Sequence, residues 1–153
     1  MNRAQRQKFA EREERRVQRQ EREGAAGRLL AAVPALATLD LSIHETRPDG
    51  CLGDNHYIRR IVVEHAPALF EIPCSYPDCE DGGYDLTREV LHALARGLPR
   101  FEGDRTCRGR CRAVDCTRVL RFVATATYRA TPPQVEAPSI SGDPFGRRPN
   151  LVG

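Results

Sequence analysis

The chain contains 153 residues, of which 40% are hydrophobic and only 6% are aromatic, and it has no tryptophan. This length suits one domain with appendages, and the scarcity of aromatic residues leaves little material for a core. The formal net charge of +3 is unevenly distributed, because residues 1–23 and 99–129 are net basic and residues 30–98 are net acidic. Polarised charge bears on partners and solubility, and here it favours an anionic partner.

The N-terminal segment lacks the apolar stretch of a signal peptide and is too rich in glutamate for a transit peptide. No apolar run has the length needed to cross a bilayer, so we expect no membrane partner. These features predict a cytoplasmic protein. In a reducing compartment, the six cysteines favour metal binding over disulfides.

Residues 2–23 are predicted to form a helix, because they include many strong helix formers and neither glycine nor proline. Phe9 and Val17 are the only large apolar residues, too few for a core-facing stripe. Four arginines at helical spacing share one face: Arg12, Arg15, Arg16 and Arg19. The segment is either a solvated arm or an arm that becomes ordered on RNA or an acidic protein. Residues 25–33 extend this helix or begin a second one, which Pro34 ends or kinks.

Three regions follow from the pattern: a charged helical arm over 1–36, a body over 37–129 and a proline-rich flexible tail over 130–153. The pattern of apolar and polar residues along the body predicts strands over 39–45, 56–64, 68–72, 100–107 and 117–129. A helix is predicted over 85–97, with Asp85 as N-cap and Gly97 closing its C-terminus. We therefore expect an α+β fold, a small antiparallel sheet with one packed helix, clasped by a metal site. The tail has no periodicity and is expected to be disordered.

Two similar motifs contain most of the cysteines: CSYPDC begins at Cys74 and ends at Cys79, and CRAVDC begins at Cys111 and ends at Cys116. Four intervening residues lie within the usual spacing of a ligand pair, and four tetrahedral thiolates are the set that structural Zn²⁺ prefers. Strand ends and short turns bring such sulfurs together at little cost in loop closure. The arrangement resembles zinc-ribbon and zinc-knuckle modules only in the spacing of its ligands. Buried free thiols and disulfides are the alternatives.

Five cysteines compete for four ligand positions. The repeated motif favours Cys111, whereas the sequence CRG after Cys107 favours that residue, because a glycine two positions later allows backbone N–H groups to point at the sulfur. Cys107 and Cys116 could also face each other as the last rungs of a hairpin. The predicted zinc ligands are Cys74, Cys79, Cys107 and Cys116, with Cys111 as the alternate for Cys107. Cys51 lies alone in a predicted loop and is expected to be an ordinary thiol.

Three further arginines surround the predicted metal loop: Arg108, Arg110 and Arg112. They either contact phosphate groups or offset the negative charge of a zinc–thiolate centre. The candidate nucleic-acid contacts are therefore Arg12, Arg15, Arg16, Arg19, Arg108, Arg110 and Arg112. Only Tyr76 and Tyr84 are placed to stack on bases, so sequence-specific reading of a single strand is not expected.

No enzyme motif accompanies these residues. The chain contains no Ser-His-Asp arrangement, phosphate-binding glycine loop or HExxH, and the CxxxC at 107–111 lacks the spacing of thioredoxin-like sites. The sequence thus predicts a small cytoplasmic zinc module that binds a macromolecule, RNA or another polyanion, without catalysis or a small-molecule substrate. A protein-interaction adaptor that uses the N-terminal helix is the alternative, and a redox or metal enzyme is a third.

Overall fold

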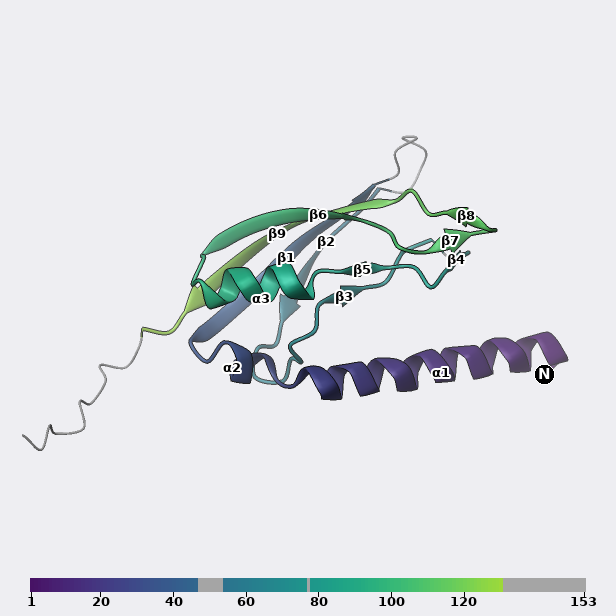
Figure 1. Ribbon diagram of the computed structural model, residues 1–153, viewed down its shortest axis with the longest axis horizontal. Coiled ribbons are helices and arrows are strands. Elements are labelled where there is room, and N and C mark those ends of the chain that lie inside the picture. Colours follow the sequence, from purple (N-terminus) through teal and green to yellow (C-terminus); the bar gives the residue numbers. More distant parts are fainter. Residues whose placement is uncertain (47–53, 77, 131–153) are drawn as a thin grey trace, which may run out of the picture.

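A four-stranded antiparallel sheet forms the centre of the molecule in the computed structural model, which describes residues 1–46, 54–76 and 78–130 (Figure 1). Its strands are β1 (Leu36–Thr46), β2 (Asn55–Ile61), β6 (Arg100–Thr106) and β9 (Val119–Tyr128), in the order β2-β1-β9-β6. All three pairings are antiparallel, and the first and last long strands are neighbours at the middle of the sheet. The predicted α+β class with an antiparallel sheet is confirmed.

Strict alternation of side chains gives this sheet one buried face. In β1, Leu39, Leu41 and Ile43 are at most 1% exposed, and in β9 Leu120 and Phe122 are equally buried. Because successive side chains of a strand point to opposite faces, these residues lie on the same side of the sheet. The predicted strands over 39–45 and 117–129 are therefore confirmed, with slightly different ends.

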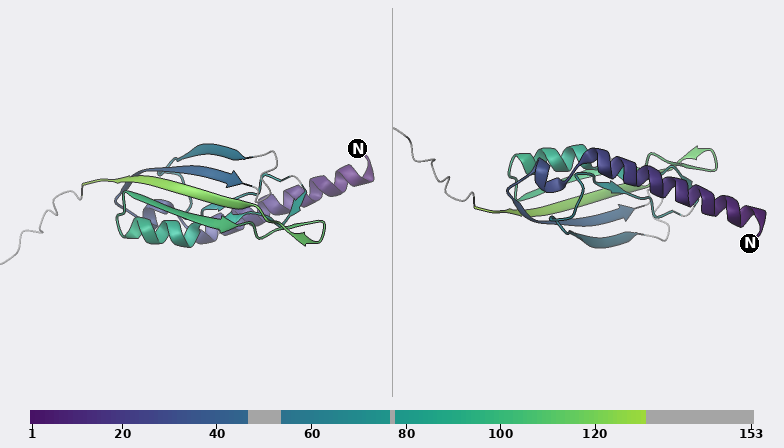
Figure 2. Two further views of the ribbon diagram at one scale, coloured as in Figure 1. Left: turned by 90° about the horizontal axis from the view of Figure 1, so that it is seen from above. Right: turned by 90° about the horizontal axis from the view of Figure 1, so that it is seen from below.

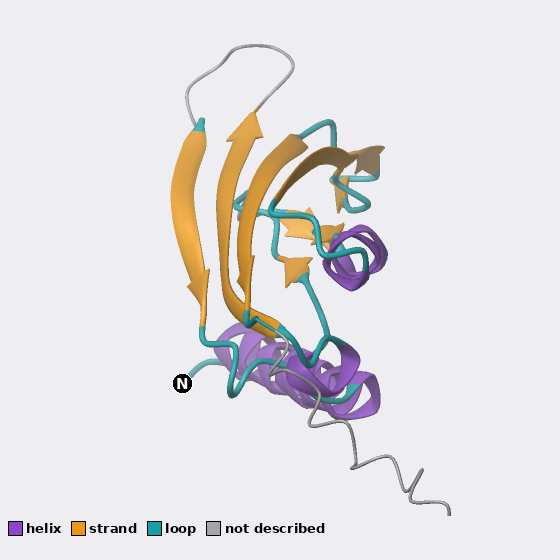
Figure 3. Ribbon diagram, turned by 90° about the vertical axis from the view of Figure 1, so that its left-hand side faces the viewer, coloured by secondary structure: helices purple, strands orange, loops and turns teal. Residues whose placement is uncertain are grey.

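Helix α3 (Thr87–Ala95) contributes Val90 and Leu94 to the core. Figure 3 shows α3 and α2 on the same side of the sheet. The N-cap is Leu86 and not the predicted Asp85, whose carboxylate instead accepts a hydrogen bond from the Thr87 amide at 3.0 Å. Gly97 closes the helix as predicted: its φ is 70°, and its N–H donates to the Leu94 carbonyl at 3.0 Å.

The remaining strands are two residues long. β3 (Glu71–Ile72) pairs with β5 (Tyr84–Asp85), and β4 (Cys79–Glu80), β7 (Arg110–Cys111) and β8 (Val114–Asp115) form a separate three-stranded sheet. The predicted strand over 68–72 is thus shorter than expected and lies outside the main sheet. The strand predicted over 56–64 ends at Ile61, because the chain then turns and the Ala66 N–H bonds the Val62 carbonyl at 2.9 Å.

The N-terminal segment forms two helices, α1 (Arg3–Ala26) and α2 (Leu29–Ala32). The side chains of Asn2 and Gln5 cap α1 reciprocally, and none of its residues is buried, as its lack of an apolar stripe predicted. Leu29 of α2, by contrast, is fully buried. Figures 1 and 2 show α1 lying along the body, with its N-terminus towards the end that contains β4, β7 and β8 in Figure 1.

Two expectations concern residues beyond this description. The loop with Cys51 falls within 47–53, and almost all of the predicted flexible tail falls within 131–153, both outside the described residues. Within the part of the chain that is described, no helix combines the length and apolarity that crossing a membrane requires.

Candidate metal centre

Four cysteines from three separate segments converge at one end of the sheet. Cys74 follows β3, Cys79 begins β4, Cys107 follows β6, and Cys116 lies between β8 and β9. Their sulfur atoms all lie within 4.8 Å of one another, and the Cys79 and Cys107 sulfurs are 3.7 Å apart. Four ligands placed ~2.3 Å from a tetrahedral zinc ion would be separated by about 3.8 Å. The cluster therefore has the composition and size of a site that could hold a metal ion.

The fifth described cysteine is not one of these four, although its thiol adjoins the cluster and hydrogen bonds with Cys116 and Cys79. Cys111 is in β7, where it is the cross-strand partner of Cys79, and its sulfur does not belong to the group of four. The cluster thus contains Cys107, as the CRG sequence predicted, and not the alternate. Of the two similar motifs, CSYPDC supplies two sulfurs and CRAVDC supplies one.

Backbone amides surround the sulfur of Cys107. The N–H of Gly109 donates to it at 3.4 Å and that of Gly83 at 3.3 Å, so the predicted turn after Cys107 is present. The hairpin register differs from the prediction, however. The Cys107 N–H bonds the Arg118 carbonyl, and the Cys116 N–H bonds the Gly109 carbonyl, so the two cysteines are not directly opposite. Their side chains still meet, because β6 ends and β9 begins at the same end of the sheet.

Gly82 and Gly109 have no side chains, and sulfur atoms of the cluster lie next to the place where a Cβ atom would be. A Cβ atom on Gly82 would lie 2.2 Å from the Cys79 sulfur and 3.1 Å from the Cys107 sulfur. A Cβ atom on Gly109 would lie 2.4 Å from the Cys79 sulfur. Real Cβ atoms do not approach other atoms so closely, so any larger residue at either position would displace the cluster.

The protonation of the thiols reflects their crowding. Burial, with the nearby cysteines, raises the pKa of Cys74 to about 12 and raises the pKa of Cys79 as well. At Cys116, burial is outweighed by hydrogen bonds from the Arg118 backbone and from other cysteines, so its pKa is lowered. Four thiolates cannot share so small a volume without a cation. The cluster is therefore suited to a metal ion that supplies the missing positive charge.

A buried polar network supports the first cysteine motif from the main sheet. Arg118, next to the start of β9, donates to the Glu45 carboxylate of β1 at 2.9 Å, and both side chains are less than 10% exposed. Ser75, beside Cys74, hydrogen bonds to both of these side chains. The Arg118 guanidinium also lies 5.3 Å from the centre of the Tyr76 ring. The network fixes the loop of Cys74 against the sheet.

Sequence reasoning missed this network, although the alternation contained a signal. Glu45 continues the inward-facing series of Leu41 and Ile43 in β1, and Arg118 continues the inward-facing series of Leu120 and Phe122. A carboxylate and a guanidinium on the buried face require partners, and each is the partner of the other.

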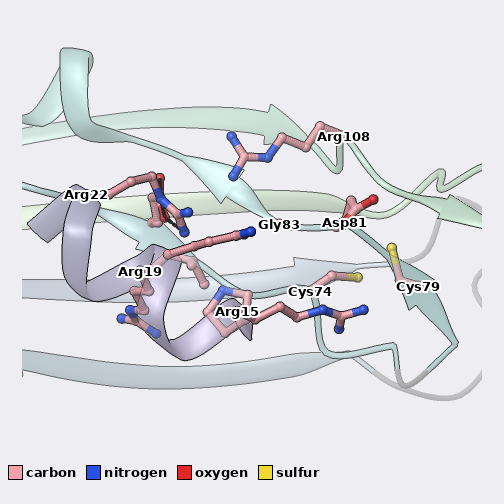
Figure 4. A pocket seen from close by; sticks show the side chains of 13 residues that line it. Arg15, Arg19, Arg22, Cys74, Cys79, Asp81, Gly83 and Arg108 are labelled. Atoms are coloured by element: carbon pink, nitrogen blue, oxygen red, sulfur yellow. Dashed lines mark hydrogen bonds and ion pairs between the residues drawn. The ribbon is translucent and has the colours of Figure 1, made fainter. Parts of the chain in front are cut away.

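The predicted arginines are divided between different surroundings. Arg15, Arg19 and Arg108 line one cleft of about 650 Å³ beside Cys74 and Cys79, and Figure 4 shows the side chains that line it. Arg22, which was not predicted, lines the same cleft. The other predicted arginines do not line it. Arg12 lines a separate pocket with Met1 and Phe9, and Arg112 occupies an exposed turn. Arg16 pairs with Glu13, and Arg110 pairs with Asp115.

Comparison with known proteins identifies no relative of this chain. No family model matches the chain, and no curated protein or solved structure is significantly similar to it. The chemistry of the site consequently rests on its own residues.

Proposed function

We propose that this chain is a small zinc-stabilised cytoplasmic module that binds a macromolecular polyanion, RNA above all, without catalysis. The observation that carries the proposal is the convergence of Cys74, Cys79, Cys107 and Cys116 beside an arginine-lined cleft. Four cysteine sulfurs are the ligand set typical of a closed, structural zinc site, which leaves no position for a reactive water.

The charge of the surroundings supports an anionic partner. Helix α1 has no buried residue, and its side chains are predominantly arginine, glutamine and glutamate. A helix that contributes nothing to the core is available for a partner, and arginine is well suited to phosphate because its planar guanidinium can donate two parallel hydrogen bonds.

The zinc part of the proposal is tested by metal analysis of protein purified without chelator. We expect about one zinc ion per chain. Cys79→Ser and Cys116→Ser should lose the metal, and Cys107→Ser should lose more of it than Cys111→Ser. Protein that is metal-free, or a Cys111→Ser variant that loses as much zinc as Cys107→Ser, would contradict the assigned ligand set.

The polyanion part is tested by affinity capture from lysate with and without nuclease. Partners that disappear after nuclease treatment, together with direct binding of purified protein to RNA at low salt, would support the proposal. Partners that resist nuclease, with no direct RNA binding, would favour a protein-interaction adaptor, for which the exposed Phe9 and Val17 of α1 are the available apolar contacts.

A further inference from the structure

The arginine-lined cleft lies between two parts of the chain that are far apart in sequence. One wall is α1, with Arg15, Arg19 and Arg22, and the other is the loop region around the cysteines, with Arg108 and the backbone of Gly82 and Gly83. Figure 4 shows the side chains of Arg15 and Arg108 reaching into this space from opposite sides. The cleft therefore exists only when the arm lies against the metal end of the body.

An ion pair helps to hold α1 in this position. Arg22 donates to the carboxylate of Glu71 through Nε at 3.1 Å and through Nη2 at 3.0 Å, and the Glu71 side chain is only 15% exposed. Two-point arginine–carboxylate pairing restricts orientation as well as distance. The pair consequently fixes the last turns of α1 beside β3, and the more N-terminal Arg15 and Arg19 extend over the cleft.

Arginine side chains outnumber acidic side chains in the lining of the cleft. Its two acidic lining residues are Glu71, which is neutralised by Arg22, and Asp81. Arg19 pairs with Glu23 at 3.1 Å. The side chains of Arg15 and Arg108 form no hydrogen bond or ion pair with any residue in the described part of the chain. The guanidinium groups of Arg15 and Arg108 thus line the cleft without a carboxylate partner, beside a cysteine cluster whose thiolates would carry negative charge.

We infer that this cleft is a binding site for one phosphate-bearing nucleotide unit of an RNA strand, held between Arg15 and Arg108. The inference rests on the proposed function, because it names where the polyanion binds. The volume of about 650 Å³ is within the range of roughly 300–1,000 Å³ typical of ligand pockets. A phosphodiester between the two guanidinium groups would give both a hydrogen-bonded anionic partner, and the sugar and base would extend along the open cleft.

The test measures binding of a short fluorescein-labelled oligouridylate to full-length, metal-loaded protein by fluorescence anisotropy. Arg15→Gln and Arg108→Gln should each weaken binding about tenfold, the loss expected for one charge-assisted hydrogen-bonded contact. Each should also make the dependence of log affinity on log salt concentration shallower by about 0.7, the value for one lost phosphate contact to a single strand. Combined, the two substitutions should cost less than the product of their separate effects, because both residues hold one phosphate.

Each variant has a control that removes the same charge from a nearby element. Arg3→Gln lies in the first turn of α1, and Arg100→Gln lies in β6, which leads to Arg108, and neither of these exposed residues lines the cleft. These controls should weaken binding no more than roughly threefold, as expected for exposed charges without a direct contact. An oligomer of the same sequence with a neutral methylphosphonate backbone should bind wild-type protein and the Arg15→Gln variant equally weakly.

The outcomes separate failure of the cleft from failure of the proposed function. If all four substitutions weaken binding equally, RNA binds through diffuse charge, so the cleft inference is overturned and the polyanion function survives. If wild-type protein does not bind RNA at low salt, both are overturned. If Arg108→Gln lowers zinc content and leaves affinity unchanged, and Arg15→Gln also leaves affinity unchanged, the arginines serve the metal centre and the inference is wrong.

Discussion

Gly82 has no side chain, and the space it leaves is occupied by sulfur. A Cβ atom added to Gly82 would lie 2.2 Å from the Cys79 sulfur, and this clash could be relieved only by moving a cysteine of the cluster. Gly82→Ala should therefore weaken zinc binding by about tenfold to a hundredfold, the range found when the supporting shell of a metal site is disturbed. Competition with a zinc-binding dye measures this affinity.

Gly24→Ala is the control for that substitution. Gly24 lies in α1, and a Cβ atom there would meet nothing within 4 Å. Its zinc affinity should equal that of the wild type, and alanine should slightly favour the helix. Equal affinity in the Gly82→Ala variant would mean that the sulfurs can be displaced without cost, contrary to the geometry described above.

The buried pair of Glu45 and Arg118 gives a second prediction at this scale. Arg118→Met leaves the Glu45 carboxylate buried without its cationic partner, and breaking such a pair typically costs about 3–5 kcal/mol. Urea denaturation of zinc-saturated protein should show this loss. Arg121→Met, which changes an exposed arginine of β9 three residues away, should change stability much less. The double variant Glu45→Gln/Arg118→Met should recover part of the loss, because no buried charge is left.

At the scale of elements, the long strands and α3 could be predicted from sequence because they bury a regular stripe. Leu39, Leu41 and Ile43 alternate in β1, and Val90 and Leu94 recur at helical spacing in α3. The two-residue strands β4, β7 and β8 are too short to have a period, and their pairings follow from where the cysteine loops meet. Their existence could not be inferred from local sequence.

The candidate site was likewise predictable from sequence only in part. The four cysteines were predictable because thiol chemistry, motif spacing and a nearby glycine restrict the choice, even though the exact hairpin register was wrong. The arginine cleft was not predictable as a unit. Arg15 and Arg108 are far apart in the chain, and the Arg22–Glu71 pair that brings their segments together leaves no local pattern.

Helix α1 gives a prediction at the scale of elements. None of the residues of α1 is buried, and its ion pair to the body has a half-exposed arginine, so little stability depends on it. Deletion of residues 2–23 should leave the melting temperature almost unchanged, as scanning fluorimetry would show. Deletion through residue 32 should unfold the protein, because it removes Leu29, which is fully buried. A large destabilisation by the shorter deletion would mean that α1 is part of the core.

At the scale of the whole molecule, we expect stability to be divided between apolar packing and a metal bound by the cysteine cluster. Apolar packing secures the middle of the sheet, whereas the end with β4, β7 and β8 has strands of only two residues each. A structural zinc ion can contribute on the order of 10 kcal/mol to folding, which is comparable with the total stability of a typical domain, roughly 5–15 kcal/mol.

Removal of the metal should therefore lower the melting temperature steeply. Zinc-loaded protein should be heated with and without a strong chelator, and a chelator already saturated with zinc is the control. Re-addition of zinc should restore the original transition. An unchanged transition in the metal-free protein would show that the cluster contributes no folding energy.

The central pairing of β1 with β9 has a consequence for how the body can be joined to other chains. Leu36 and Tyr128 are register partners, and the Arg129 N–H bonds the Ala35 carbonyl at 2.7 Å. The entrance and the exit of the body are thus adjacent, at the end of the sheet away from the cysteines. Adjacent ends are the condition for circular permutation and for insertion into a loop of another protein. Because Leu29 of α2 is buried in the core, a transplanted unit would have to include α2, and only α1 extends from it.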